Sequence, residues 1–245
     1  MIKLLQGDCL ELMKKIPDKS IDMILCDLPY GTTSQNKWDS VIPFEPMWEQ
    51  YKRIIKDNGA IVLFSQLPFA SDLIQSNKKM FRYEWIWVKD NATGFLNAKK
   101  MPLKIHENIL VFYKKLPLYN PQMRTGFKPY KCKQGSHSNN YGDYQEGHIT
   151  ESNGERYPID IIKFNRDKDK LHSTQKPVAL LEYLIKTYTN EGDLVLDNCF
   201  GSCSTGVACI NTNRNFIGME LDEEFFKIGK QRIDDRLKEK EREKE

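Results

Sequence analysis

The sequence predicts an α/β fold built on one doubly wound, mostly parallel sheet that carries a long insertion. Three observations lead to this fold. Short segments that are apolar throughout alternate with helix-like segments along most of the chain, and one stretch of different composition interrupts the alternation. At 245 residues the chain is long enough for one domain with a large core, so residues 1–245 are expected to form a single domain.

Six segments are expected to form the strands of this sheet. They are rich in β-branched and aromatic residues, as strands covered by helices on both faces are. They span residues 21–28, 60–65, 83–88, 107–113, 193–199 and 215–221. Trp85 and Trp87 are two residues apart, so they share one face of their strand and are expected to pack in the core.

Six helices are expected between the strands, over residues 9–16, 46–55, 69–76, 178–188, 205–211 and from 222 onward. In the stretch HSTQKP, Ser173 or Thr174 would be the N-cap of the fourth helix and Pro177 a first-turn residue. Lys176 beside this helix start opposes the helix dipole. Either an anion binds next to Lys176, or Lys176 is a chance surface lysine.

The segment of residues 114–165 is rich in Gly, Asn, Ser, Pro and Tyr, and it is too long to be a plain connection inside a compact domain. We expect an inserted functional module here, between a first half, residues 1–113, and a second half, residues 166–245. Its first part, residues 114–133, has no Asp or Glu, contains three aromatic residues, and carries the basic residues Lys114, Lys115, Arg124, Lys128, Lys131 and Lys133. This composition suits contact with phosphate groups.

Composition excludes several classes of protein. The net charge of +3 is too small to predict a nucleic-acid partner by itself. No apolar run reaches the length of a membrane span, and the first residues lack the pattern of a signal peptide, so a soluble, cytoplasmic protein is expected. The cysteines and histidines show no spacing of a metal site, and reduced, mostly buried thiols and no metal are expected.

The stretch CDLPYG, residues 26–31, follows the apolar segment IDMIL. An ordinary strand-exit turn explains Asp27, Pro29 and Gly31, because each of these residue types suits turn geometry. Such a turn has no particular use for Tyr30 between Pro and Gly. The stretch is therefore a candidate site at the carboxyl end of a strand.

A second candidate site is DLVLDNCFGSCSTGVAC, residues 193–209. A strand ending at Asp197 leads into a small-residue turn and a helix near Thr205, where backbone N–H groups can face a ligand. Glu220 ends the next strand 23 positions after Asp197, where a doubly wound nucleotide site places the carboxylate that accepts ribose hydroxyls. The turn lacks the Lys-Ser/Thr of a P-loop and the central glycine of a dinucleotide site. A cofactor with ribose but no phosphate, such as S-adenosylmethionine, fits better.

The motifs DLPY, HSTQKP, FGSCSTG and GMELDEEFF together resemble the amino-group DNA methyltransferases, which modify adenine N6 or cytosine N4. Their order along the chain resembles the β class of that family. The resemblance implies a Rossmann-like fold that uses S-adenosylmethionine, with residues 114–165 as the target-recognition region. It covers nearly the whole chain except that region and the C-terminal tail.

The resemblance also implies roles for individual residues. Asp27 and the carbonyl of Leu28 would accept hydrogen bonds from the target amino group, Pro29 would hold that carbonyl forward, and Tyr30 would stack on the extruded base. The cofactor would contact Asp8, Cys9, Asp27, Thr174, Lys176, Asp197, Phe200, Gly201, Ser202, Thr205 and Glu220. Asp8 and Glu220 would lie near its adenosine, and Thr174 and Lys176 near its methionine end. The expected DNA contacts are Trp38, Lys99, Lys100, Arg124, Lys128 and Lys131.

Two residues depart from the pattern of the family. Leu28 stands where the family usually has a second proline, which is tolerable if only its backbone carbonyl acts. Cys203 stands where the glycine turn commonly has another Gly, so a left-handed backbone at this position would be strained by the side chain.

The expected activity is methylation of adenine N6 in double-stranded DNA. Cytosine N4 methylation is the first alternative, because the two reactions share their geometry. From another class, a non-catalytic nucleic-acid-binding protein with a degenerate cofactor pocket is favoured by Cys203 and opposed by Asp27, Tyr30 and Glu220. A restriction endonuclease partner and a homodimer are further alternatives that stay open.

Overall fold

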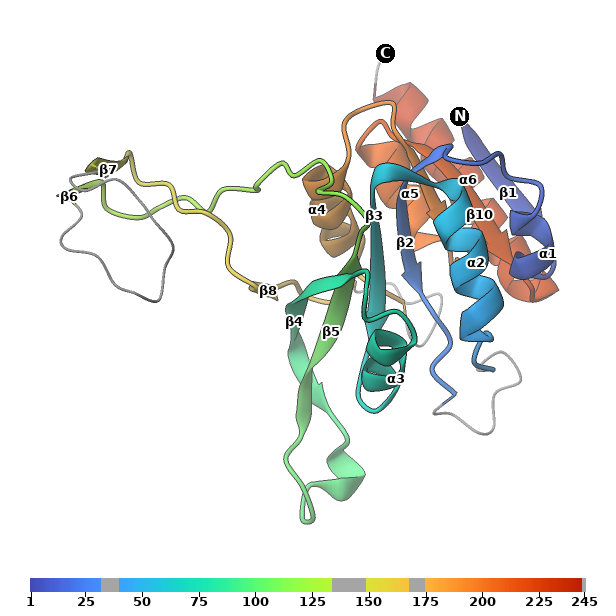
Figure 1. Ribbon diagram of the computed structural model, residues 1–245, viewed down its shortest axis with the longest axis horizontal. Coiled ribbons are helices and arrows are strands. Elements are labelled where there is room, and N and C mark those ends of the chain that lie inside the picture. The colour runs from blue at the N-terminus through green and yellow to red at the C-terminus, as the bar shows by residue number, and fades with distance from the viewer. Residues whose placement is uncertain (32–39, 134–148, 168–174, 244–245) are drawn as a thin grey trace. The chain divides into compact units, whose positions relative to one another are not determined.

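The computed structural model of the chain describes residues 1–31, 40–133, 149–167 and 175–243. The chain divides into two compact units. One combines residues Met1–Asn120 with Asp160–Glu245, and the other consists of Pro121–Ile159. The first unit contains the large sheet and its helices (Figure 1).

The sheet of the first unit has eight strands, and most of its neighbouring pairs are parallel. In spatial order the strands are β1 (Ile2–Gln6), β10 (Asn215–Glu220), β9 (Leu194–Asp197), β2 (Ile21–Asp27), β3 (Ile55–Ser65), β5 (Lys104–Phe112), β4 (Phe81–Thr93) and β8 (Ile161–Lys163). Only β5 runs antiparallel to its neighbours β3 and β4. The predicted doubly wound, mostly parallel sheet is confirmed.

Helices cover both faces of this sheet. Successive strand residues point to opposite sides, so each face carries its own core, which the helices on that side close. The core on one face includes Ile24 and Leu63 and is closed by α1 (Cys9–Met13), α2 (Phe44–Ile54) and α3 (Phe69–Ser76). The core on the other face includes Leu25 and Val62 and is closed by α4 (Val178–Tyr188), α5 (Ser204–Asn211) and α6 (Glu223–Arg242). Trp85 and Trp87 belong to this second core, as predicted.

All six predicted strands and all six predicted helices are present; α3 and α4 have the predicted ends, and the other elements have shifted ends. Two strands of the sheet were not predicted. β1 is a short N-terminal segment that pairs only with β10, and β8 has three residues, so neither carries a long apolar pattern. The helix start expected at Ser173 or Thr174 lies outside the described residues. Pro177 is the capping residue of α4 and not a first-turn residue, and the N–H of Val178 donates to the carboxylate of Asp167 at 3.3 Å.

The second unit is a small antiparallel pair, β6 (Tyr130–Lys133) with β7 (Ile149–Ser152). The guanidinium of Arg156 organises it. This group lies 4.4 Å from the ring centre of Tyr130 and donates to the carbonyl of Lys128 at 2.8 Å. The insertion predicted over residues 114–165 includes this unit and adds short flanking segments.

Within the described ranges, no helix is both long and apolar enough to cross a membrane. All six cysteines are free thiols; Cys26, Cys203 and Cys209 are buried, whereas Cys132 is exposed. Cys9 and Cys199 are half-buried, so Cys132 is the exception to the expectation of mostly buried thiols; it lies in the two-stranded β6–β7 pair, where β6 is exposed throughout.

Cys203 has the left-handed backbone that its glycine-like position demands, with φ at 61° and ψ at 36°. Its side chain is fully buried, and its sulfur fills the space beside Gly206, where an added Cβ would lie 2.7 Å from that sulfur. A side chain in this conformation costs about 1–2 kcal/mol. The turn that leads into α5 therefore holds backbone strain at Cys203.

This strain predicts an unusual response to glycine. In Cys203→Gly, relief of the left-handed strain offsets the lost packing and the added chain entropy, so the free energy of unfolding should stay within about 1 kcal/mol of the parent. Cys209→Gly is the matched control, because Cys209 is an equally buried thiol inside α5. It should lose about 2 kcal/mol from helix propensity and lost burial. Urea unfolding measures both, and equal losses in the two variants would contradict strain at Cys203.

Candidate active site

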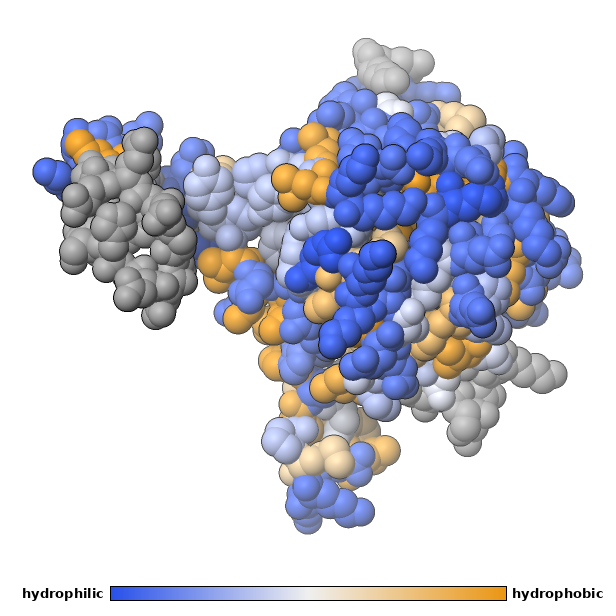
Figure 2. Space-filling view, in the orientation of Figure 1, coloured by the Kyte–Doolittle hydropathy of each residue, from blue (hydrophilic) through white to orange (hydrophobic). Residues whose placement is uncertain are grey.

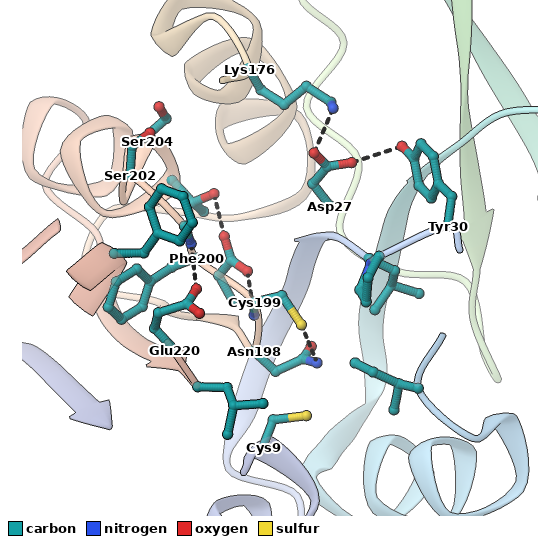
Figure 3. A pocket seen from close by; sticks show the side chains of 18 of the residues that line it. Cys9, Asp27, Tyr30, Lys176, Asn198, Cys199, Phe200, Ser202, Ser204 and Glu220 are labelled. Atoms are coloured by element: carbon teal, nitrogen blue, oxygen red, sulfur yellow. Dashed lines mark hydrogen bonds and ion pairs between the residues drawn. The ribbon is translucent and has the colours of Figure 1, made fainter. Parts of the chain in front are cut away.

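The carboxyl ends of β1, β10, β9 and β2 meet at one edge of the sheet, because these neighbouring strands are parallel. A cavity of about 870 Å³ opens at this edge (Figure 3). Its volume lies in the range of sites for cofactors and small molecules. A doubly wound sheet is expected to bind its ligand here, outside the carboxyl ends of the strands.

The structure brings most of the predicted catalytic and cofactor residues to this one cavity. The residues that line it include Asp8, Cys9, Asp27, Leu28, Pro29, Tyr30, Lys176, Asp197, Phe200, Gly201, Ser202, Thr205 and Glu220. Thr174 and Trp38 lie outside the described residues. The two polar strand ends that the sequence singled out, after β2 and after β9, therefore belong to one site.

Glu220 at the end of β10 is held in place by backbone N–H groups. Its carboxylate accepts from the N–H of Gly201 at 2.8 Å and from that of Asp222 at 2.9 Å. Burial raises the pKa of Glu220 above its ordinary value, although these two N–H groups act in the opposite direction. A carboxylate can accept about four hydrogen bonds, so Glu220 retains acceptor capacity for a ligand.

Asp197 at the end of β9 holds the turn after it. Its carboxylate accepts from the Thr205 hydroxyl at 2.6 Å and from the Cys199 N–H at 3.1 Å. Burial raises the pKa of Asp197 to about 6, partly balanced by these hydrogen bonds. Asp197 and Thr205 thus fix the start of α5, and their partners lie within the protein.

Asp8 and the thiols form the part of the cavity next to β1. Asp8 is the N-cap of α1, and its carboxylate accepts from the N–H of Leu10 at 2.7 Å. Cys9 and Cys199 are half-buried, and the side-chain amide of Asn198 donates to the Cys199 sulfur at 3.5 Å. This wall therefore combines two thiols with one carboxylate and one side-chain amide.

Asp27 at the end of β2 binds two side chains. One carboxylate oxygen accepts from the Lys176 ammonium at 2.5 Å, and the other accepts from the Tyr30 hydroxyl at 2.7 Å (Figure 3). Burial raises the pKa of Asp27 above its ordinary value against the opposing effect of the Lys176 ammonium. The Tyr30 ring rests on Phe69, with 5.1 Å between ring centres.

The position of the Leu28 side chain explains how the chain accepts leucine in place of proline. Its side chain is 4% exposed and belongs to the core that α1, α2 and α3 close. The residue still lines the cavity, so a carbonyl can act there while the side chain contributes to packing.

Lys176 pairs with carboxylates of the protein itself. Its ammonium lies 2.5 Å from Asp27 and 3.3 Å from Glu107, and its side chain is 8% exposed. Burial lowers the pKa of Lys176, but the two carboxylates outweigh burial and raise the pKa above its ordinary value. Of the two alternatives that the sequence left open, a chance surface lysine is wrong. The neighbouring anions in the structure are carboxylates of the chain itself.

Glu107 and Lys89 were missed by the sequence analysis. Glu107 lies in β5, Lys89 lies in β4, and the two form an ion pair in which each side chain is 12% exposed. Burial raises the pKa of Glu107, whereas Lys176 and Lys89 lower it, and the net pKa is below the ordinary value. A charged residue at the start of the apolar run NILVF was the only available signal.

The residues expected to contact DNA fall into two groups. Lys99 and Lys100 lie in the hairpin between β4 and β5, which extends away from the helices of the first unit (Figure 1). Both are exposed, as are Phe95 and Leu96 in the same hairpin, at 78% and 84%. Figure 2 shows hydrophobic and hydrophilic side chains together at the end of this hairpin.

The other group, Arg124, Lys128 and Lys131, belongs to the second unit. Lys128 and Lys131 are exposed, and Lys131 forms an ion pair with Glu151. Arg124 is half-buried, and its guanidinium donates to the carbonyl of Tyr157 at 3.0 Å. Arg124 and Lys131 therefore use part of their charge inside this unit.

Known proteins are similar to this chain in sequence over almost its whole length. Type II methyltransferase M.HpaI of Haemophilus parainfluenzae is 28% identical over 95% of this chain and 74% of its own length. The DNA adenine methyltransferase YhdJ of Escherichia coli (strain K12) is 28% identical over 94% of this chain and 82% of its own length.

Solved structures are similar over almost the whole chain. The M1.HpyAVI–SAM complex matches with a TM-score of 0.64 and 26% identity, covering 95% of this chain and 100% of that one. The cytosine-N4-specific PvuII DNA methyltransferase matches in fold, with a TM-score of 0.68 and 15% identity over 96% of this chain and 90% of that one.

A family of proteins described as DNA methylases, the N6/N4 methyltransferases, matches residues 21–231. These residues include both polar strand ends, the buried Lys176 and Glu220. The chain therefore belongs to the N6/N4 DNA methylase family.

Proposed function

We propose that this protein transfers a methyl group from S-adenosylmethionine to the exocyclic N6 amino group of adenine in double-stranded DNA. The observation that carries the proposal is the position of Asp27, whose half-buried carboxylate ends β2 at the same cavity as Glu220, the expected ribose acceptor. Membership of the DNA methylase family supports this reading. The name of YhdJ, a DNA adenine methyltransferase, favours adenine.

The cavity fits S-adenosylmethionine in its donors and its walls. Glu220 is rigidly held and keeps acceptor capacity, as recognition of ribose hydroxyls requires. Phe200 is packed against Phe226, with 5.9 Å between ring centres, and gives the cavity an apolar wall for adenine. The described part of the cavity offers no P-loop lysine, which agrees with a cofactor that has no phosphate. When bound, the cofactor supplies an activated methyl group on a sulfonium.

The residues of CDLPYG would act on the target base. The lone pair of the amino nitrogen is delocalised into the ring, so the site must orient this group and stabilise the positive charge that develops on it. Asp27 would accept a hydrogen bond from the amino group, and the carbonyl of Leu28 would accept the second. The carboxylate of Asp27 would then stabilise the cationic nitrogen in the transition state, and no covalent enzyme intermediate is needed.

Tyr30 would have two states. In the structure its hydroxyl donates to Asp27, so it occupies part of the acceptor that the amino group needs. An extruded base would displace this hydroxyl from Asp27 and stack on the ring. Stacking would offset part of the few kcal/mol that base extrusion costs.

DNA would contact the hairpin between β4 and β5. No acidic residue occurs between Asn91 and His106, whereas Lys99, Lys100 and Lys104 do. Exposed apolar side chains next to basic ones are typical of proteins that open the base stack. Thr93 at the base of this hairpin lines the cavity, so the hairpin lies beside the proposed base site.

One experiment tests the proposed reaction directly. The protein is incubated with duplex DNA of mixed sequence and S-adenosylmethionine that carries a trideuterated methyl group, and the nucleosides are analysed by mass spectrometry. Labelled N6-methyldeoxyadenosine is the expected product. Labelled N4-methyldeoxycytidine alone would replace adenine by cytosine as the target. Tight DNA binding without any labelled nucleoside would favour the non-catalytic alternative.

The roles within CDLPYG predict different losses for different substitutions. Asp27→Asn keeps an acceptor oxygen but removes the charge, so turnover should fall strongly while the affinities for cofactor and duplex stay nearly unchanged. Tyr30→Phe should keep much of the activity, whereas Tyr30→Ala should lose roughly 1–3 kcal/mol of stacking. Single-turnover methylation with saturating DNA and cofactor measures these effects. Parent rates in both Asp27→Asn and Tyr30→Ala would make this stretch an ordinary exit turn.

Glu220→Ala is expected to weaken S-adenosylmethionine binding. The variant loses charge-assisted hydrogen bonds to the ribose, which are worth roughly 1.5–3 kcal/mol. Isothermal titration measures the affinity. Glu224→Ala is the matched control, since it removes an exposed acid in the first turn of α6 that does not line the cavity. An affinity as high in Glu220→Ala as in Glu224→Ala would remove Glu220 from the site.

The hairpin lysines are expected to contribute to DNA affinity through phosphate contacts. In the double variant Lys99→Ala with Lys100→Ala, the slope of log affinity against log salt should fall by up to ~0.9 for each contact removed. Lys14→Ala with Lys15→Ala, two exposed lysines after α1, is the control with the same change in net charge. Fluorescence anisotropy with a duplex at several salt concentrations measures the slopes. Equal slopes in the two double variants would place DNA elsewhere.

A further inference from the structure

Glu107 is a buried carboxylate that the proposed reaction leaves without a role. It lies in β5, two residues before the fully buried Ile109, and its side chain is 12% exposed. One of its oxygens forms an ion pair with Lys89. The other, Oε2, lies 3.3 Å from the Lys176 ammonium and has no partner in hydrogen-bond geometry among the described residues.

A charge in such a place needs an explanation beyond stability. Burying ions costs free energy that their mutual attraction often does no more than repay, so apolar side chains of similar volume are commonly as stable. β4, β5 and the segment before α4 nevertheless bring Lys89, Glu107 and Lys176 together at the cavity. A function at the site is the better explanation.

The charge of Lys176 creates the need for a second carboxylate. Its ammonium lies 2.5 Å from the Asp27 carboxylate. This carboxylate is the group that would stabilise a cationic amino nitrogen. A cation at this distance reduces the negative potential that Asp27 presents to the base. Glu107 faces the same ammonium and shares its positive charge, so Asp27 is not fully neutralised.

We propose that Glu107 is a positioning residue for methyl transfer, which holds the Lys176 ammonium between two carboxylates and preserves the negative potential of Asp27 toward the target amino group. The proposal rests on the proposed function of Asp27. Glu107 acts through Lys176 and does not touch the base.

The surroundings of this pair set the expected pH dependence. The charged or titratable groups that face Asp27 and Glu107 come from four strands and two loops. They are Cys26 from β2, Tyr30 in the loop after β2, Lys89 from β4, Lys104 from β5, Asp197 from β9 and Lys176 before α4. Burial raises the pKa of Asp27, and the negative charge of Glu107 raises it further. Removal of that charge therefore lowers the pKa of Asp27.

Glu107→Gln is the main test, because it removes the charge and keeps the shape. Turnover in single-turnover methylation at neutral pH should fall about tenfold, which corresponds to ~1.4 kcal/mol. Activity requires ionised Asp27 and is lost as the pH falls through the pKa of Asp27. The acid limb of the rate profile should therefore move to lower pH in Glu107→Gln, while the affinity for S-adenosylmethionine stays unchanged.

A second variant gives the opposite sign. Lys89→Gln removes the cation on the far side of Glu107, so the field of Glu107 at Asp27 becomes stronger and the acid limb should move to higher pH. Asp22→Asn is the matched control, since Asp22 forms a half-buried ion pair with Lys56 at the other end of β2, at 2.6 Å. Its acid limb should coincide with that of the parent.

A readout without turnover separates this proposal from the proposed function. The carboxyl ¹³C resonance of Asp27 is titrated by NMR in the parent, Glu107→Gln and Lys89→Gln. Shifts of the midpoint in opposite directions support the coupling even if the parent methylates no DNA, in which case the proposed function alone fails. An unchanged midpoint in both variants overturns the proposal. A fall in turnover with an unmoved acid limb also overturns it and leaves Glu107 a structural residue.

Discussion

The ion pair between Asp27 and Lys176 is the interaction on which the site depends. It joins residues 149 positions apart, one at the end of β2 and one just before α4, so it forms only when both halves of the chain have folded onto one sheet. The pair lies where burial disfavours both charges, and Glu107 and Lys89 complete a group of alternating charge. The Lys176 ammonium and the Tyr30 hydroxyl together hold the Asp27 carboxylate in place at the cavity.

The order of the strands explains why the proposed cofactor site and the proposed base site lie in the same cavity. β9 is the direct neighbour of β2, so the turn that leads to α5 and the stretch CDLPYG leave the sheet side by side. The proposed cofactor residues on β9 and β10 therefore face the proposed base residues after β2. The second unit enters the chain between β5 and β8, away from these strand ends in the sequence. Its strands form a separate sheet, so it contributes no strand to the carboxyl edge.

Local patterns predicted much of this molecule, and long-range contacts did not follow from them. The apolar strands and the amphipathic helices are local, as are the strand ends at Asp27, Asp197 and Glu220, and all were predicted. The edge strands β1 and β8 are too short to carry a pattern. Glu107 was missed because a single acid in a strand reveals nothing about its partners. For the same reason, the sequence suggested an anion beside Lys176 but could not identify it as Asp27.

The central claim is that Asp27 is the acceptor for the amino group of an extruded base. A crystal structure of the protein with duplex DNA and an unreactive cofactor analogue, in which an amine replaces the sulfonium, tests it most directly. The account predicts an adenine outside the helix, its N6 within hydrogen-bond distance of Asp27 and the Leu28 carbonyl, and the Tyr30 ring stacked on it. A complex in which the DNA is bound but no base reaches Asp27, with Tyr30 still bonded to that carboxylate, would contradict the account.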